Sequence, residues 1–138
     1  LLACSTQVEI EVRNRLRAQF GISLARFDYL AQLHRHADGL RMSTLSRYLM
    51  VTGGNVTALT DELAREGMVL REDDADDRRS YRLRMTPAGR KAFERIARAH
   101  EQWVIELFGG LETTHKQSLY ELLGRLRVQL AENQEAPA

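Results

Sequence analysis

Apolar residues recur every three or four positions along most of the chain, which is the period of an amphipathic helix. Val8, Val12, Leu16 and Phe20 show this spacing in the first segment, which Gly21 ends. The same period returns in five later segments. The helices predicted on this basis cover approximately residues 1–19, 24–36, 44–50, 53–66, 87–108 and 115–132.

Short polar residues stand where several of these helices are expected to begin, because a side-chain oxygen there accepts a hydrogen bond from a free backbone N–H. Ser23 is the predicted N-cap of the second helix, and Ser43 or Thr44 that of the third. Thr52 is the predicted N-cap of the fourth helix. Thr86 precedes the fifth helix and is followed by a proline, which suits the first helical position.

The periodicity changes from helical to two after the fourth helix. Residues 68–70 begin one strand, and on a second strand Leu83 alternates with Arg82 and Arg84. The polar stretch 72–80 between them is the predicted loop of a hairpin. We therefore predict a mainly α fold with a small β-hairpin, in a single domain of residues 1–138.

The composition fits a soluble protein. Of the 138 residues, 43% are hydrophobic and 28% are charged, and no apolar run approaches the roughly 20 residues that a membrane helix needs. We therefore expect a cytoplasmic protein with no membrane partner. The net charge of +1 does not by itself indicate nucleic-acid binding, so that hypothesis depends on where the charges lie.

The residues that could carry chemistry argue against an enzyme. The single cysteine excludes an intrachain disulfide and a cysteine-based zinc site. His34 and His36 are two residues apart, so on a helix they do not share a face and do not form a metal-binding pair. The sequence also shows no nucleophile elbow, phosphate loop or paired carboxylates. We expect no catalytic residue, no metal and no cofactor.

The third and fourth helices are short, and a tight connection with two glycines joins them, which is typical of a helix-turn-helix. The second helix of this motif enters the major groove of DNA. Asn55 has the groups to pair with adenine, Thr57 offers a hydroxyl and a methyl group, and small residues permit close approach. A helix pair that only packs is the alternative. The predicted DNA-binding residues here are Ser43, Arg47, Thr52, Gly54, Asn55, Thr57 and Ala58.

The hairpin follows the fourth helix directly, and its expected loop carries Arg78 and Arg79. A hairpin that projects arginines beside a groove-reading helix is a wing, whose arginines enter the minor groove or bind phosphates. Arg82, on the strand after the loop, is the third predicted contact of the wing. We therefore predict a winged helix-turn-helix over about residues 41–86.

Five acidic residues between positions 72 and 77 count against DNA binding, since they would repel phosphates. An aspartate that holds an arginine through a charge-assisted hydrogen bond resolves part of this conflict. A winged helix that binds another protein through its acidic surface is the alternative. Salt separates the two hypotheses, because DNA binding by arginines weakens steeply as salt rises.

The order of these motifs resembles the MarR family of bacterial transcriptional regulators over nearly the whole chain. Residues 22–33 are similar to the family's second helix, and residues 45–69 are similar to its helix-turn-helix. The most specific likeness is the wing segment Asp74–Ser80, with Leu83, Thr86 and Gly89 after it.

The resemblance implies roles for residues of the wing and of the reading helix. Asp77 would position Arg79, and Arg79 would lie in the minor groove. This chain departs from the family at two positions: Ala75 stands where proline is usual, and Ala58 stands where many members have a basic residue. The second departure puts one common DNA contact in doubt.

The resemblance also implies a homodimer, formed by dimerisation helices of about residues 1–20 and 88–133, on a pseudo-palindromic double-stranded DNA operator. The pattern of apolar residues agrees with a dimer, because the first, fifth and sixth helices are apolar on one side and a small winged domain cannot cover them all. Two recognition helices would then lie about one turn of DNA apart.

Members of this family commonly bind small phenolic or carboxylate effectors between the dimerisation helices and the winged domain. The segments 1–4, 27–33 and 51–57 are most similar to a branch that controls the breakdown of aromatic acids and responds to aryl-CoA thioesters. The resemblance implies a repressor that such a ligand releases. The candidate effector residues are Phe20, Tyr29, His34, His100 and Trp103, and a place in the core is the alternative for each.

A thiol sensor is a further alternative for the control of this chain. Cys4 would be the redox-sensing residue of such a repressor. Residues 5–7 offer no group that would activate its thiol.

Overall fold

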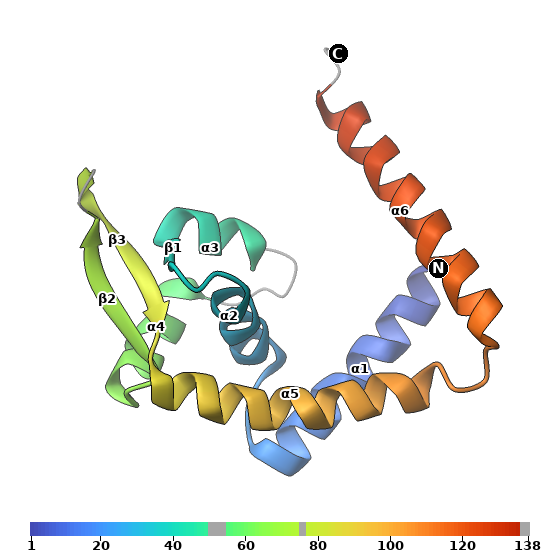
Figure 1. Ribbon diagram of the computed structural model, residues 1–138, viewed down its shortest axis with the longest axis horizontal. Helices are drawn as coiled ribbons and strands as arrows, with labels where there is room; N and C mark the ends of the chain where they lie inside the picture. The colour runs from blue at the N-terminus through green and yellow to red at the C-terminus, as the bar shows by residue number, and fades with distance from the viewer. Residues whose placement is uncertain (50–54, 75–76, 136–138) are drawn as a thin grey trace. The chain divides into compact units, whose positions relative to one another are not determined.

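The computed structural model describes residues 1–49, 55–74 and 77–135, without the side chains of residues 74–80 and 135. It confirms the mainly α fold with a small sheet (Figure 1). The chain divides into two compact units, Leu1–Glu101 and Gln102–Ala138, and the boundary lies within the fifth helix. The elements in chain order are α1 Leu2–Phe20, α2 Leu24–Arg35, β1 Leu40–Arg41, α3 Met42–Tyr48, α4 Val56–Arg65, β2 Val69–Asp74, β3 Asp77–Met85, α5 Pro87–Leu107 and α6 Thr113–Glu135.

Several predicted helix ends are confirmed by their hydrogen bonds. Gly21 ends α1 in the left-handed conformation, with φ 66° and ψ 24°. The Ser23 hydroxyl accepts a hydrogen bond from the backbone N–H of Arg26 at 3.1 Å, so Ser23 is the N-cap of α2. The Thr86 hydroxyl accepts one from the N–H of Gly89 at 2.9 Å, directly before α5 begins at its proline. A capping residue next to each helix thus determines these three helix ends.

The sheet has three antiparallel strands in the order β1-β3-β2. Val69 pairs with Met85 at the base of the hairpin, and the register shifts between Asp73 and Asp74 near its tip. The predicted loop 72–80 is wrong, because β2 continues to Asp74 and β3 begins at Asp77. Charged residues on both faces of these strand ends hide the alternation that marks a strand. In Figure 1 the hairpin extends beyond the helices that precede it.

The core of the first unit lies where α2, α3 and α4 meet the sheet. Its fully buried side chains come from every one of these elements, so a single apolar centre holds the helix pair and the hairpin together. The close packing includes the start of α5: a methyl group at Gly89 would collide with the backbone of Met68, just before β2. The most deeply buried side chains include Leu16, Tyr29, Leu30, Leu33, Leu45, Leu49, Thr60, Leu63, Val69 and Leu83.

The second unit consists of the end of α5 and the long helix α6. One side of α6 carries leucines at spacings of three and four residues, and they are exposed in the single chain. Such a continuous apolar stripe on an exposed helix marks an interaction surface. None of the helices among the described residues is long and apolar enough to span a membrane. The exposed leucines of the stripe are Leu119, Leu122, Leu123, Leu126 and Leu130.

Candidate nucleic-acid interface

The exposed face of α4 forms the first part of the candidate interface. Thr57, Ala58 and Asp61 are exposed on this helix, with Asp61 four residues after Thr57 and three after Ala58, while Val56 and Leu63 are buried on its other side. Residues at that spacing share one face of a helix. The predicted base contacts Thr57 and Ala58 therefore lie on an open surface, together with a carboxylate that we did not include in the predicted site.

Asn55 is the N-cap of α4. Its side-chain Oδ1 accepts a hydrogen bond from the backbone N–H of Ala58 at 3.1 Å. The prediction that Thr52 caps this helix is wrong, because the helix begins at Val56 and Asn55 supplies the cap. Thr52 and Gly54, both predicted DNA contacts, lie outside the described residues. Asn55 itself is exposed and stays a predicted base contact, with its oxygen also serving the helix.

A buried hydrogen bond holds α4 against α2. The hydroxyls of Tyr29 and Thr60 lie 2.7 Å apart, and the Thr60 hydroxyl donates to the carbonyl of Val56 at 2.7 Å. Burial raises the pKa of Tyr29 to about 12, although the hydrogen bond with Thr60 and the positive charge of Arg71 act in the opposite direction. Tyr29, a candidate effector residue, thus belongs to the core that holds α4 in place.

Helix α3 precedes α4 and presents two of the predicted contacts. Ser43 and Arg47 are exposed, whereas Leu45 between them is fully buried. The prediction that Ser43 or Thr44 caps this helix is wrong. The helix begins at Met42, directly after β1, and its N-cap Arg41 makes no side-chain capping bond. The short strand, still paired with β3, brings the chain straight into the first turn of α3.

The wing is the hairpin of β2 and β3. Arg78 and Arg79 belong to β3, and their side chains lie outside the described part of the chain. Arg82 has a second role that the sequence did not indicate, because its guanidinium donates to the carbonyls of Asp38 and Gly39 at 3.3 Å each. Arg82 thus ties the wing to the turn before β1, and its contact with DNA stays a prediction.

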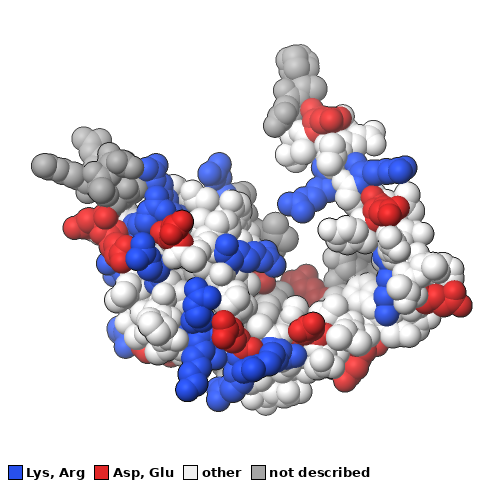
Figure 2. Space-filling model, in the orientation of Figure 1, with Lys and Arg blue, Asp and Glu red and all other residues white. Residues whose placement is uncertain are grey.

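Ion pairs balance part of the acidic charge of the wing. Arg84 lies 3.5 Å from a carboxylate oxygen of Glu72, and Arg71 of β2 forms an ion pair and hydrogen bond with Asp61 of α4. Figure 2 shows basic and acidic side chains interleaved over the winged-helix unit. The predicted pair of Asp77 and Arg79 lies outside the described side chains and stays a prediction.

A cluster of aromatic rings lies between α2 and α5, within the first unit. The ring centroid of Phe27 lies 5.4 Å from that of Phe93 and 4.6 Å from that of His100. The ring of His34 lies 5.0 Å from Phe93, and its Nε2 lies 3.1 Å from a carboxylate oxygen of Glu94. Burial lowers the pKa of His100. Two of the candidate effector residues, His34 and His100, thus lie in one cluster.

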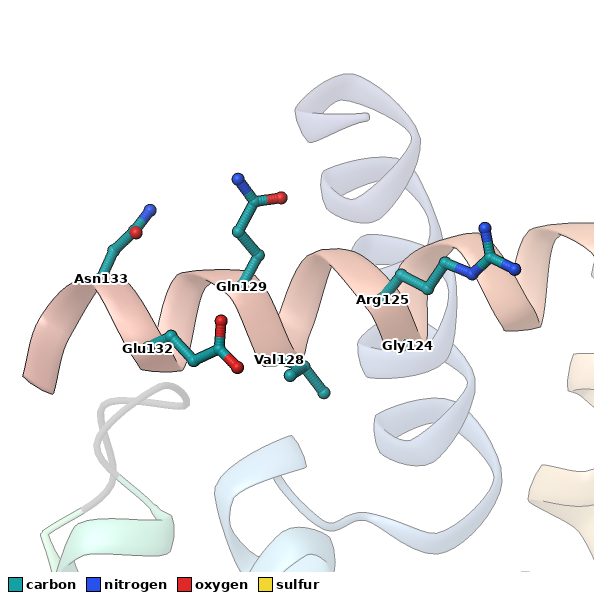
Figure 3. A pocket seen from close by; sticks show the side chains of 6 residues that line it. All are labelled: Gly124, Arg125, Val128, Gln129, Glu132 and Asn133. Atoms are coloured by element: carbon teal, nitrogen blue, oxygen red, sulfur yellow. The ribbon is translucent and has the colours of Figure 1, made fainter.

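Two further candidates lie on α5 and on α1. Trp103 is buried in the second unit, with 5% of its surface exposed. Cys4 is exposed on α1. A shallow hollow runs along one side of α6; Figure 3 shows the side chains that line it. The lining residues of this hollow are Gly124, Arg125, Val128, Gln129, Glu132 and Asn133.

Known proteins share both the sequence and the fold of this chain. The sequence pattern of the MarR family matches residues 20–80. A solved structure, a MarR family transcriptional regulator from Silicibacter pomeroyi, is 34% identical, with a TM-score of 0.73. The match covers 95% of this chain and 88% of that one. The chain belongs to the MarR family. It is therefore a DNA-binding transcriptional regulator and not an enzyme.

Two further known proteins resemble this chain. The Streptomyces coelicolor regulator Sco3205, solved in complex with DNA, is 23% identical with a TM-score of 0.77, over 91% of this chain and 80% of that one. It shows the shared fold. BadR of Rhodopseudomonas palustris, named a transcriptional activatory protein, is 35% identical over 69% of this chain. The chain spans 58% of BadR, and 51% to 68% of the first curated relatives it matches.

The sequence did not indicate the contacts that join one element of this MarR fold to another. Asp61 and Arg71 are ten residues apart, and Tyr29 and Thr60 are separated by 31. Periodicity places each of these residues on a face of its own helix or strand and says nothing of its partner. For Asp61, the only signal in the sequence was its place on the exposed face of the fourth helix.

Proposed function

We propose that this regulator is a repressor that binds a pseudo-palindromic operator as a homodimer and is released by a small aromatic ligand or its CoA thioester. DNA would be contacted by α3, α4 and the wing. The observation that carries this assignment is the open face of α4, which is capped, locked to α2 by a buried hydrogen bond and joined to the wing by an ion pair. A reading helix held from both sides presents its side chains in one fixed geometry.

The contribution of the wing is tested by Arg79→Ala. We expect the affinity for a duplex selected by the wild-type protein from a random pool to fall by about 1–3 kcal/mol, as for the loss of one good groove contact. Arg95, exposed on α5 outside the winged helix-turn-helix, offers a matched control. If Arg79→Ala and Arg95→Ala bind this duplex equally well, the wing is not part of the interface.

The homodimer is supported by the leucine stripe of α6, which the single chain leaves exposed. Burial of a leucine contributes about 1.5–3 kcal/mol, so a charge in the stripe should weaken association strongly. We expect Leu126→Glu to give a monomer in sedimentation at micromolar concentration. Val128→Glu, on the opposite side of the same helix, should remain a dimer. A wild-type monomer under these conditions would refute the dimer.

The effector is proposed to bind at the aromatic cluster of α2 and α5. The cluster combines closely spaced, tilted aromatic rings with His34 and the half-buried His100, which suits a planar ligand with a polar group. A ligand there releases DNA only if it binds better to a dimer geometry that no longer fits the operator. A difference of about 1–3 kcal/mol is sufficient for a clear response.

A thermal-shift screen of aromatic acids and their CoA esters, followed by release of the bound duplex, tests the effector. His100→Leu should abolish the shift caused by a true ligand, whereas His115→Leu on α6 should not. If no compound shifts the melting temperature, and oxidation releases DNA from the wild type but not from Cys4→Ser, the thiol-sensor alternative replaces the ligand. A reporter assay with the gene deleted decides between repressor and activator, the role named for BadR.

A further inference from the structure

The ion pair between Asp61 and Arg71 lies where the recognition helix meets the wing. Both side chains are partly open to solvent, with 51% and 39% of their surface exposed. Arg71 is paired across the hairpin with the buried Leu83, so it extends from the side of the sheet that faces α4. Burial raises the pKa of Tyr29, and the positive charge of Arg71 acts against that rise, which places Arg71 near the buried hydrogen bond of Tyr29 as well.

The position of Asp61 presents an electrostatic problem for DNA binding. It shares the open face of α4 with Thr57 and Ala58, the predicted base contacts. A bare carboxylate on that face would approach the phosphates of the groove and repel them. A basic side chain at position 58 would offset this charge, but Ala58 has only a methyl group. Something else must neutralise Asp61 when DNA is bound.

We infer that Arg71 is a positioning residue of the DNA interface, which acts through Asp61 and not by touching DNA. Its guanidinium neutralises the carboxylate on the reading face, and the same contact ties the wing to α4 so that both approach the duplex as one body. Arg65 of the same helix donates from its Nε to the backbone carbonyl of Asp61 at 3.3 Å, so this bond belongs to the helix and leaves the carboxylate to Arg71. This inference rests on the DNA-binding function proposed above.

A double-mutant cycle on binding to the selected duplex tests the inference. Arg71→Met exposes the charge of Asp61 and should weaken binding about fivefold to tenfold, the size of the repulsion between two unit charges about 4 Å apart in water. Asp61→Asn should bind at least as well as the wild type. The double variant Arg71→Met with Asp61→Asn should recover to within about twofold of Asp61→Asn alone, because the charge that Arg71 neutralises is gone.

The matched control is the other ion pair of the hairpin. Arg84 and Glu72 are similarly exposed, at 44% and 41%, and lie on the opposite face of the strands. The double variant Arg84→Met with Glu72→Gln should bind DNA no better than Arg84→Met alone. Exposed pairs contribute little to stability, so all these variants should keep the wild-type melting temperature within a few degrees.

Two outcomes would overturn the inference, and each has a distinct signature. If Arg71 contacts a phosphate directly, the double variant binds as weakly as Arg71→Met, and its plot of log affinity against log salt loses about 0.9 in slope. We expect the double variant to keep the wild-type slope. If instead the wild-type protein selects no duplex from the pool, the DNA-binding function fails, and the role of Arg71 fails with it.

Discussion

Replacing Tyr29 by phenylalanine removes one hydroxyl group from the contact between α2 and α4 and leaves the ring in place. The side chain is fully buried, and its hydroxyl lies 2.7 Å from that of Thr60. Thr60 keeps its own bond to the Val56 carbonyl, so no buried donor is left unpaired. We therefore expect a loss of about 1 kcal/mol in the free energy of unfolding, the net value of one hydrogen bond.

Thr60→Val should cost more, about 2–3 kcal/mol, because it leaves the Tyr29 hydroxyl buried without its partner. Urea unfolding at a fixed protomer concentration measures both variants and their combination. The combination should cost less than the sum of the two single changes, because the hydroxyls share one bond. If Tyr29→Phe costs more than Thr60→Val, or if the two changes are additive, the assigned roles of donor and acceptor are wrong.

The raised pKa of Tyr29 predicts that the free energy of unfolding depends on pH. The pKa of Tyr29 is raised from 10.0 to about 12, so the fold favours the neutral phenol. The stabilisation from this group is complete below pH 10 and is lost as the pH rises from 10 to about 12. The stability difference between the wild type and Tyr29→Phe should therefore narrow across that window. A difference that stays constant up to pH 12 would contradict the raised pKa.

Three further changes test the packing, the cap and the aromatic cluster. Gly89→Ala should destabilise the protein by about 1–3 kcal/mol, since its methyl group meets the backbone of Met68, whereas Gly124→Ala has open space and should not lower the melting temperature. Asn55→Ala should cost about 1 kcal/mol in urea unfolding and Asn55→Asp much less, because only the second keeps the cap; equal losses would exclude the capping role. His100 has a lowered pKa, so the fold should lose stability as the pH falls below 6.5, and His100→Leu should remove this loss in an acid titration of the melting temperature.

The order of the elements follows from the sequence because helices and strands of this chain bury one face each. Where only two residues take part, as in β1, no period exists to detect, and the strand is defined only by its pairing with β3. The start of α4 was placed too early for a related reason. Thr52 and Asn55 are both good capping residues, and only the packing of Val56 against the core decides which one begins the helix.

The candidate site was predictable as a surface and not as a set of contacts. The exposure of Ser43, Arg47, Thr57 and Ala58 follows from the helical period. Arg82 shows the limit of this reasoning: alternation along its strand predicts an open side chain, yet the turn before β1 supplies two carbonyls within its reach. Long charged side chains find partners that depend on tertiary structure, which a pattern along one chain does not contain.

The acidic residues of β2 also affect how the protein behaves in the absence of DNA. β2 is the last strand in the order of the sheet, so its outer edge offers backbone groups to which a strand of another molecule could add. Glu72, Asp73 and Asp74 lie along that edge. A second copy of the same edge would bring like charges directly opposite one another, which disfavours pairing. The charges that weaken the attraction of the wing for phosphates thus protect it from edge-to-edge aggregation, and they leave association to the helices.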